Sequence, residues 1–362
     1  MRRSLNEPIS DKRLTAATSG HEDLRVVSGH RSGATIAIAV HSTALGPALG
    51  GVRMWRYDTA ADGVADVLRL ARAMTYKAAA AGLDLGGGKG VICAPVERPV
   101  GELRRRLLLD FGDAVESLEG RYVTAEDVGT GADDMVVIAE RTAHVVGLPA
   151  ERGGSGDPSP VTARGVLAAI GASLEHRFGD ASVHGRRVCV VGVGNVGSRL
   201  ARMLAAAGAD LAISDIDPAR RALAMELGAD WVDPEEAITA DCDVLAPCAL
   251  GGAIDVATVE RLRCGIVCGS ANNVLSEEGL ANALARRGIL YAPDFIANAG
   301  GLINVYAELH DLDGEEALDL VDGIGSTVRR ILEAADRRGV TPLVAAQAQA
   351  RERLRGATVA AA

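Results

Sequence analysis

The chain has 362 residues, which is long for one domain and sufficient for two. Hydrophobic residues make up 48% and aromatic residues only 3%, so aliphatic side chains and alanine must fill the cores. Asp and Glu outnumber Lys and Arg by 48 to 38, which gives a formal net charge of −10. An acidic chain repels phosphate backbones, so nucleic acid is not expected as a partner, and we interpret the charge as ordinary solubility.

The six cysteines are scattered and form no CxxC pair; they are Cys93, Cys189, Cys242, Cys248, Cys264 and Cys268. This spacing is typical of small buried side chains in a reducing compartment. A zinc site is the alternative, but no clustered His and Cys spacing supports it. The amino terminus, MRRSLNEP, lacks the apolar segment of a secretory signal, and no apolar run reaches the length of a membrane span. We therefore expect a cytoplasmic protein without a membrane partner.

The first third of the chain mixes strands and helices. Residues 35–40 (TIAIAV) are apolar and β-branched, which predicts a strand, and a glycine-rich stretch follows at 46–51. Between residues 60 and 81 apolar side chains recur with a period near 3.6, which predicts a helix with Lys77 just off its apolar stripe. After Gly82 the segment LDLGGGKG is expected to be a loop.

Glycine and proline mark a hinge at 153–160 (GGSGDPSP). A helix is expected over 161–175, and from 186 onwards strands and helices alternate, as in a parallel sheet with crossover helices. We therefore predict an α/β fold of two domains with a cleft between them, the second being a Rossmann-type dinucleotide-binding domain.

The segment GVGNVG (192–197) supplies the dinucleotide signature, because it follows an apolar strand at 188–193 and opens a helix. Gly192 allows a tight turn, Gly194 lets the backbone approach a pyrophosphate, and Gly197 lets the helix pack on the sheet. The partial positive charge of the helix amino terminus then faces the phosphates. The alternative is that the glycines only form a tight turn between strand and helix and bind no ligand. The cofactor-binding residues expected on the turn are Gly192, Gly194, Asn195, Val196 and Gly197.

An acidic residue closes the next predicted strand. Asp215 follows the apolar run 211–214 and lies 23 residues after Gly192. A carboxylate there accepts hydrogen bonds from the adenosine ribose hydroxyls and repels a 2′-phosphate, which favours NAD over NADP. A solvated aspartate is the alternative, and Arg220 nearby leaves NADP open.

Two lysines and a carboxylate are candidates for catalysis. Lys77 in MTYKAA, taken alone, is typical of an exposed helix lysine. Lys89 stands in GGGKG, and three glycines are costly unless backbone must approach a ligand closely. A partly desolvated lysine near a second cation has a lowered pKa and can act as a base near neutral pH. Asp127 in RYVTAEDVGT stands at a predicted strand end, and Glu126 is an equally good candidate from spacing alone.

Eight segments resemble, in order and with similar spacing, the signatures of one family. They are ALGGVRMW (48–55), LARAMTYKAAAAGLDLGGGKGVI (70–92), RYVTAEDVGT (121–130), SGDPSPVTARGV (155–166), GVGNVG (192–197), APCALGG (246–252), GSANN (269–273) and YAPDFIANAGGLINV (291–305). The family is the leucine, valine and phenylalanine dehydrogenases within the glutamate dehydrogenase superfamily. The resemblance spans roughly residues 35 to 310 and is nearest to the branched-chain (valine or leucine) enzymes.

The resemblance implies a role for each catalytic candidate. Lys77 would hold the substrate carboxylate, Lys89 would be the general acid/base that activates water, and Asp127 would bind the amino group and assist proton transfer. Substrate would bind in the cleft, which closes to exclude water. Hydride passes from Cα to NAD, water adds to the iminium, and ammonia leaves a 2-oxo acid. No metal is needed. The family also implies contacts around substrate, nicotinamide and ribose from Gly50, Thr162, Asn272 and Asn273.

Domain roles follow from the same resemblance. Residues 1–153, completed by a C-terminal helix at 331–362, would form the substrate-binding and oligomerisation domain, and 154–330 would be the Rossmann NAD-binding domain. Relatives assemble as dimers, tetramers or octamers, so we expect a homo-oligomer of unspecified size. One departure is Gly90, where family members commonly carry alanine after the lysine. The glycine is expected to loosen the loop and to be tolerated.

The side-chain pocket is expected to be lined by Leu49, Ala125, Leu302 and Val305. In glutamate dehydrogenases the positions of Leu49 and Val305 hold a lysine and a serine for the distal carboxylate. Burying that carboxylate against apolar residues would cost on the order of several kcal/mol, so glutamate is not expected. Because one methylene is worth only about 1–3 kcal/mol, valine, leucine and isoleucine all remain. Leu302, bulkier than the valine expected in a leucine enzyme, disfavours phenylalanine and slightly favours valine, unless its neighbours repack.

Two other functions stay open. One is an aromatic (phenylalanine-type) amino-acid dehydrogenase of the same family. The other is a non-catalytic NAD-binding regulatory protein. The joint presence of Lys77, Lys89 and Asp127 argues against the regulatory protein, because a sensor needs only the GVGNVG half.

Overall fold

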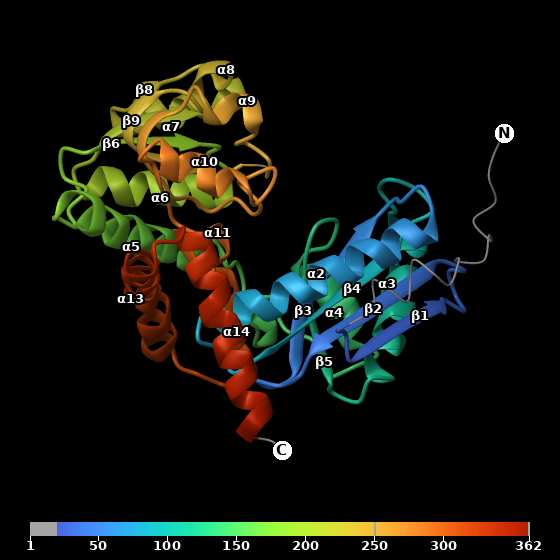
Figure 1. Cartoon of the computed structure of the whole chain (residues 1–362). Coiled ribbons are helices and arrows are strands. Elements are labelled where there is room, and N and C mark those ends of the chain that lie inside the picture. Colours follow the sequence, from blue (N-terminus) through green and yellow to red (C-terminus); the bar gives the residue numbers. More distant parts are fainter. Residues whose placement is uncertain (1–19, 250, 361–362) are drawn as a thin grey trace. The chain divides into compact units, whose positions relative to one another are not determined.

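The computed structural model describes residues 20–249 and 251–360. The MRRSLNEP segment and Leu250 of APCALGG lie outside the described residues. Contacts divide the chain into two compact units (Figure 1). Unit 1 contains the described chain up to Asp157, residues 308–310 and the chain from Ala350; unit 2 contains 158–307 and 311–349. Of the expected C-terminal complement 331–362, only the part from Ala350 groups with unit 1.

Unit 1 is a mixed five-stranded sheet covered by helices. In chain order its elements are β1 (Asp23–Ser28), β2 (Thr35–Ser42), β3 (Ala48–Trp55), α2 (Ala60–Ala80), β4 (Gly86–Cys93), α3 (Gly101–Glu116), β5 (Tyr122–Glu126), α4 (Ala132–Ala139) and the 3-10 turn η1 (Ala150–Arg152). The strand order is β1-β2-β4-β3-β5. Strands β3, β4 and β5 run parallel, whereas β2 is antiparallel to both neighbours.

Helix α2 lies along one face of this sheet (Figure 1). It begins at a capping box in which Thr59 and Asp62 satisfy each other's backbone amides. Its apolar stripe packs on β2 and β4 through a buried cluster of Ala37, Ala39, Val64, Val67, Leu68, Ala71 and Val91. The helix predicted over residues 60–81 is therefore confirmed, and it buries the stripe that its periodicity indicated.

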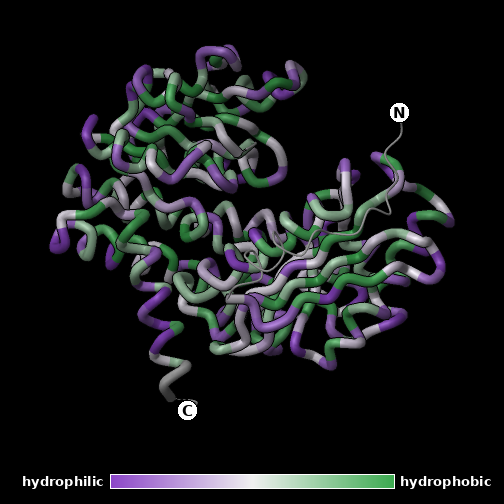
Figure 2. Tube along the Cα trace, turned by 45° about the vertical axis from the view of Figure 1, so that its right-hand side comes forward, coloured by the Kyte–Doolittle hydropathy of each residue, from purple (hydrophilic) through white to green (hydrophobic). Residues whose placement is uncertain are grey.

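Helices α3 and α4 cover the other face. Their buried side chains include Leu107, Phe111, Met135 and Ile138, which pack with aliphatic residues of β2, β3 and β4. Figure 2 shows the hydrophobic colour concentrated along the strands. Aliphatic residues fill this core, as the composition required, and Phe111 and Tyr122 are the aromatic side chains within it.

The segment GGGKG is a central strand, β4, and its prediction as a loop was wrong. A Cβ at Gly87 would lie 2.1 Å from the backbone nitrogen of Thr75 on α2. On the opposite face, a Cβ at Gly88 would lie 2.6 Å from the Tyr122 ring and one at Gly90 would lie 2.4 Å from the Phe111 ring. The glycines are present because a helix and two aromatic rings approach the strand from its two sides.

Gly90→Ala should therefore destabilise the protein, contrary to the tolerance expected from the family's usual alanine. We expect a loss of about 1–3 kcal/mol, because the new methyl group displaces the tip of the Phe111 ring in a packed core. Urea unfolding of the variant measures the loss. A second substitution, Phe111→Leu, should be less damaging in the Gly90→Ala background than alone, since the smaller side chain makes room for the methyl group. Wild-type stability of Gly90→Ala would contradict this packing.

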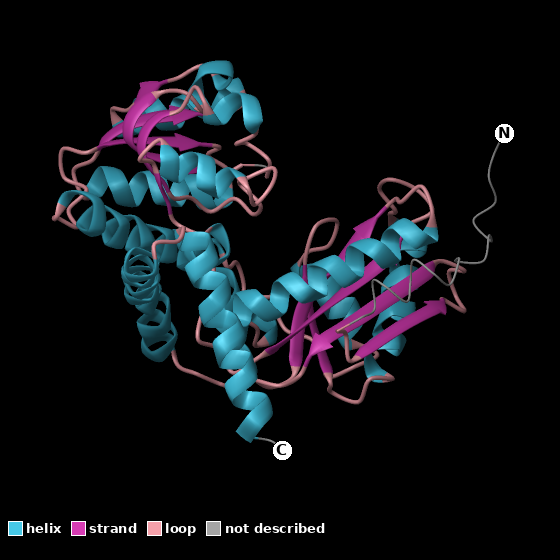
Figure 3. Ribbon diagram, viewed as in Figure 1, coloured by secondary structure: helices cyan, strands magenta, loops and turns pink. Residues whose placement is uncertain are grey.

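Unit 2 is built on a parallel six-stranded sheet of order β11-β10-β9-β6-β7-β8 (Figure 3). Its strands are β6 (Arg187–Val191), β7 (Asp210–Ser214), β8 (Asp230–Trp231), β9 (Asp241–Pro247), β10 (Arg263–Val267) and β11 (Leu290–Tyr291). The strand order doubles back at β6 and β9, which is the doubly wound arrangement of a Rossmann fold. The predicted two-domain α/β fold with a parallel dinucleotide-binding sheet is confirmed.

The remaining helices of the described chain follow in sequence order. They are α5 (Ser159–Phe178), α6 (Asn195–Ala206), η2 (Pro218–Arg220), α7 (Arg221–Leu227), α8 (Pro234–Ala237), α9 (Val256–Val259), α10 (Leu280–Arg286), α11 (Asp294–Ala297), α12 (Gly300–Leu309), α13 (Gly314–Arg338) and α14 (Pro342–Ala360). Within the described part of the chain, no helix is both long and apolar enough to cross a membrane.

Candidate active site

Lys89 and Asp127 form a shielded ion pair in unit 1. Lys89 lies on β4, on the face that α2 covers, and is only 5% exposed. Asp127 directly follows β5, and its Oδ1 lies 3.0 Å from the Lys89 Nζ. The turn after β5 is fixed by Thr130, whose hydroxyl accepts a hydrogen bond from the Asp127 amide and donates one to the Val52 carbonyl. Two candidates far apart in sequence are thus brought together.

Arg53 completes this cluster, although no role was predicted for it from the sequence. Its Nε donates to the other Asp127 oxygen, Oδ2, over 2.9 Å. The Asp127 carboxylate therefore lies between two cations and uses a different oxygen for each. Arg53 is a charged residue within the otherwise apolar strand β3 (ALGGVRMW), which is the signal that could have identified it.

Burial and the Asp127 carboxylate act on the Lys89 pKa in opposite directions, because burial disfavours the ammonium whereas Asp127 favours it. Burial lowers the pKa of Lys89, and the nearby Arg53 cation lowers it further. Burial acts to raise the pKa of Asp127, but attraction to Lys89 and Arg53 outweighs burial and lowers it. This is the environment expected for a lysine that releases its proton closer to neutral pH.

Lysine itself is rare in this chain. Among the 38 Lys and Arg residues, only Lys12, Lys77 and Lys89 are lysines. Arginine stays protonated in proteins, whereas a lysine amine can exchange its proton. Two of the three lysines belong to the candidate constellation, and at Lys89 an amine can exchange a proton where a guanidinium could not.

Glu126, the alternative carboxylate, has a different environment. It is half-buried, and burial raises its pKa, with further repulsion from Asp157 and Asp134. The structure records contacts of Lys89 and Arg53 with Asp127, and no such contact for Glu126. Spacing in the sequence could not distinguish Asp127 from Glu126, whereas the contacts in the structure favour Asp127 as the carboxylate of the site.

Lys77 lies in the last turn of α2 and is half-buried. One turn earlier, Met74 lies over β3, where a Cβ at Gly50 would be 3.3 Å from its Cγ and 1.9 Å from the Gly88 carbonyl oxygen. Gly50 thus stands where the helix and the neighbouring strand approach β3 closely. The expected pocket residues of this unit, Leu49 and Ala125, are 2% and 6% exposed on β3 and β5.

The glycine turn of unit 2 has the geometry that its sequence predicted. Gly192 has a φ of +92°, and a Cβ there would lie 2.6 Å from that of Ala249. A Cβ at Gly197 would lie 2.0 Å from the Gly192 carbonyl oxygen, so α6 packs tightly on the turn. Gly194 caps α6 and is exposed, with open space where its Cβ would be. An open backbone at a helix amino terminus fits a pyrophosphate; Asn195 and Val196 begin that helix.

Asp215 is held against this turn. Its Oδ2 accepts a hydrogen bond from the Val193 amide over 2.8 Å, and its Oδ1 accepts one from the Asp217 amide over 2.9 Å. The carboxylate therefore lies at the carboxyl end of β7, beside the glycines, where a ribose hydroxyl would bind. Arg220, the residue that left NADP open, has its Nε 3.8 Å from Asp217 Oδ2. These donors and acceptors fit NAD.

Thr162 and the Asn272–Asn273 pair also lie in unit 2. The Thr162 hydroxyl donates to the Pro158 carbonyl over 2.8 Å. The Asn272 side-chain oxygen accepts a hydrogen bond of 2.8 Å from Asn298, a residue to which the sequence analysis assigned no role. Asn273 has a φ of +51°, and its carbonyl accepts a hydrogen bond from the Gly252 amide.

Leu302 and Val305 lie one turn apart on α12. Leu302 is 6% exposed and Val305 is half-buried. The start of α12 packs closely on α5, because a Cβ at Gly300 would lie 2.9 Å from the Thr162 nitrogen. Thr162, expected near the nicotinamide, and the expected pocket residues Leu302 and Val305 therefore lie on two helices that pack against each other.

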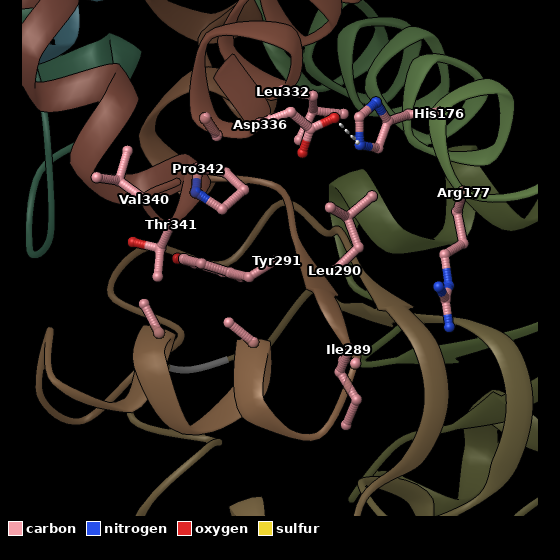
Figure 4. A pocket seen from close by; sticks show the side chains of 14 residues that line it. His176, Arg177, Ile289, Leu290, Tyr291, Leu332, Asp336, Val340, Thr341 and Pro342 are labelled. Carbon is pink, nitrogen blue, oxygen red and sulfur yellow. Dashed lines mark ion pairs between the residues drawn. The ribbon is translucent and has the colours of Figure 1, made fainter. Parts of the chain in front are cut away.

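A possible metal-binding group and a cavity lie elsewhere in the structure, and neither contains the candidate site residues. Among the described residues, the grouping that could hold a metal ion is His30, Asp110 and Asp113, but Arg31 already binds both carboxylates, at 2.9 and 2.6 Å. A cavity of about 260 Å³ in unit 2 contains none of the candidate site residues. Figure 4 shows its His176 and Asp336, whose Nε2 and Oδ2 are 3.4 Å apart.

Family models match most of the chain. The Glu/Leu/Phe/Val dehydrogenase dimerisation domain matches residues 22–144, and the glutamate/leucine/phenylalanine/valine dehydrogenase model matches 219–361. The NAD-binding domain of D-isomer specific 2-hydroxyacid dehydrogenases matches 168–250, which includes the glycine turn.

Relatives match nearly the whole chain. It is 45% identical to leucine dehydrogenase of Thermoactinomyces intermedius, over 92% of this chain and 91% of that one. It is also 45% identical to valine dehydrogenase of Streptomyces virginiae, over 92% and 94%. The crystal structure of L-tryptophan dehydrogenase from Nostoc punctiforme superposes with a TM-score of 0.84 at 38% identity, covering 96% of this chain and 99% of that one. With these matches and the site geometry, the chain belongs to the glutamate/leucine/phenylalanine/valine dehydrogenase family of NAD-dependent amino-acid dehydrogenases.

Proposed function

We propose that the protein catalyses the reversible, NAD-dependent oxidative deamination of a branched aliphatic L-amino acid, namely valine, leucine or isoleucine, to the 2-oxo acid and ammonia. The observation that carries the proposal is the shielded Lys89–Asp127 pair, with Nζ and Oδ1 3.0 Å apart. The names of the leucine and valine dehydrogenase relatives support the branched-chain substrate.

Held at the glycine turn of Gly192, Gly194 and Gly197 and by Asp215, NAD would supply the acceptor for the hydride of the substrate Cα. Lys77 binds the substrate carboxylate as a cation, and Asp127 accepts hydrogen bonds from the amino group. Lys89, as a neutral amine, takes a proton from water as the water adds to the iminium carbon, and returns a proton to the departing ammonia. Burial supports this role, because it lowers the pKa of Lys89 and keeps bulk water from competing for the proton.

Leu49, Ala125, Leu302 and Val305 are proposed as the residues that bind the side chain of the substrate. None of these can pair with a carboxylate, so glutamate is excluded from the proposed substrates. An aromatic amino acid is the second candidate. It is favoured by the 41% identity to L-tryptophan dehydrogenase over 94% of this chain and 95% of that one.

We further propose that the protein is a cytoplasmic homo-oligomer that assembles through unit 1. The match of a dimerisation-domain model to residues 22–144 supports this assembly. Neither nucleic acid nor membrane is a proposed partner, in accord with the net charge of −10.

One assay tests the proposed function. The protein is incubated at alkaline pH with NAD or NADP and a panel of aliphatic, aromatic and acidic amino acids, and reduced cofactor is followed by absorbance. We expect turnover with valine, leucine and isoleucine, and a preference for NAD because of Asp215. Turnover on glutamate alone would overturn the pocket argument. A complete lack of turnover would leave the non-catalytic NAD-binding protein as the better description.

A further inference from the structure

Arg53 belongs to a chain of ion pairs that extends from the catalytic pair to helix α2. One guanidinium nitrogen, Nε, donates to Asp127 Oδ2 over 2.9 Å. Another, Nη1, donates to Asp66 Oδ2 over 3.0 Å. Arg53 therefore bridges the end of β5 and the second turn of α2 through two different nitrogens, as the planar fork of arginine allows.

Asp66 is itself held from two sides. The Tyr57 hydroxyl donates to Asp66 Oδ2 over 2.7 Å, and Arg69 donates to Oδ1 over 2.7 Å. The side chains of Asp66, Arg53 and Asp127 are 16%, 21% and 22% exposed, so the chain of contacts is partly shielded. Such a network restricts the orientation of the Arg53 fork more than a single surface ion pair would.

We propose that Arg53 is a positioning residue that, anchored by Asp66 on α2, fixes the Asp127 carboxylate so that its Oδ1 faces Lys89. A carboxylate held by one oxygen can still rotate about its terminal bond. With Arg53 on Oδ2, the plane of the carboxylate is set and Oδ1 remains for Lys89. The inference rests on the proposed function of Lys89 and Asp127 and adds a residue outside the pair.

The charges of Arg53 and Asp66 act on the pKa of Lys89 in opposite directions. Asp127, Arg53 and Asp66 are charged groups that act on the Lys89 amine. Arg53 lowers the pKa of Lys89, whereas Asp66 raises it. Removing Arg53 should therefore move the Lys89 pKa upward, and removing the charge of Asp66 should move it downward. These shifts report the charges of Arg53 and Asp66, so the positioning role itself is tested by a variant that keeps the charge of Arg53 and loses its planar fork.

Three variants test the proposal. Arg53→Gln should lower kcat for the amino acid about 10–100-fold, the order expected for a misplaced catalytic group. It should also move upward the pH midpoint at which activity rises as Lys89 loses its proton. Arg53→Lys keeps the charge but has no fork, so kcat should fall while the midpoint stays near the wild-type value. Asp66→Asn should lower kcat and move the midpoint downward. Arg105→Gln, which removes an exposed bidentate pair with Glu140 in the same unit, is the matched control.

A second readout does not depend on turnover. The rate at which acetic anhydride acetylates Lys89, measured by mass spectrometry as a function of pH against a reference peptide, reports the fraction of free amine. Only three lysines compete in this chain. The Lys89 profile should shift upward in Arg53→Gln and downward in Asp66→Asn, and the Arg105→Gln profile should match the wild type.

Wild-type kcat in both Arg53 variants would overturn the proposal, and so would a wild-type Lys89 profile in Arg53→Gln. So would equal shifts in the same direction for Arg53→Gln and Asp66→Asn, which would indicate a general loosening of unit 1. If Arg53→Gln fails to fold, Arg53→Lys and Asp66→Asn still decide the matter. An inactive wild type with the predicted acetylation shifts would contradict the proposed function while leaving the geometry of the cluster supported.

Discussion

Replacing Lys89 with alanine should lower kcat for the amino acid by about 10²–10⁴-fold, the contribution usual for a general acid/base. The amine is the group proposed to take a proton from the attacking water, and alanine offers none. Arginine at this position should not restore activity, because a guanidinium does not release its proton near neutral pH.

The same variant should still bind NAD with unchanged affinity. Lys89 lies on β4 of unit 1, whereas the glycine turn and Asp215 belong to unit 2. Titration calorimetry with NAD, alongside kcat measurements, separates the two effects. Substantial remaining activity in Lys89→Ala would show that another group transfers the proton. A parallel loss of NAD binding would instead indicate that the substitution disturbs more than unit 1.

Replacing Asp127 with alanine should reduce both activity and stability. The variant leaves Lys89 and Arg53 next to each other without the carboxylate that both contact. Removing one partner of a shielded ion pair costs about 3 kcal/mol, near the low end of the usual range because the Asp127 side chain is 22% exposed. We expect kcat to fall about 10²-fold or more, since the amino group loses its acceptor.

The stability loss in Asp127→Ala should depend on pH with a defined sign. Asp127 raises the pKa of Lys89, so its removal lowers that pKa further below the ordinary value of 10.5. Between the lowered folded-state pKa and 10.5 the unfolded chain binds more protons than the folded chain, and stability rises with pH. The deficit relative to wild type should therefore be largest where Asp127 of the wild type is ionised and Lys89 is protonated; it should shrink in strong acid, where Asp127 is protonated, and in alkaline solution, where Lys89 is neutral.

Urea unfolding at several pH values measures this dependence. Asp23→Ala is a matched control, because Asp23 has a similar side-chain exposure of 24% and pairs with the exposed Arg121 over 3.0 Å. Its loss should stay below about 1 kcal/mol and vary little with pH. A deficit in Asp127→Ala that grew between neutral and alkaline pH would contradict the placement of Lys89 beside Asp127.

Features that depend on neighbouring residues were readable from the sequence. The helix at 60–81 follows from the period of its apolar residues, and α2 ends at Ala80. The turn at 192–197 follows from three glycines between a strand and a helix, and its Gly192 has the positive φ that the motif requires. Both features are determined by residues that are close together in the sequence, so the sequence alone predicts them.

Features that depend on distant residues were decided only by the tertiary structure. The glycines of β4 are in a strand because α2, Phe111 and Tyr122 approach it from both sides. Asp127 rather than Glu126 meets Lys89, and Arg53 joins Asp127 to Asp66, through contacts that span up to 74 residues of sequence. Spacing along the chain carries no information on which face of a strand such partners share. Lysine positions, glycines and one aspartate thus predicted the kind of chemistry, and packing across the sheet determined which side chains stand close enough to perform it.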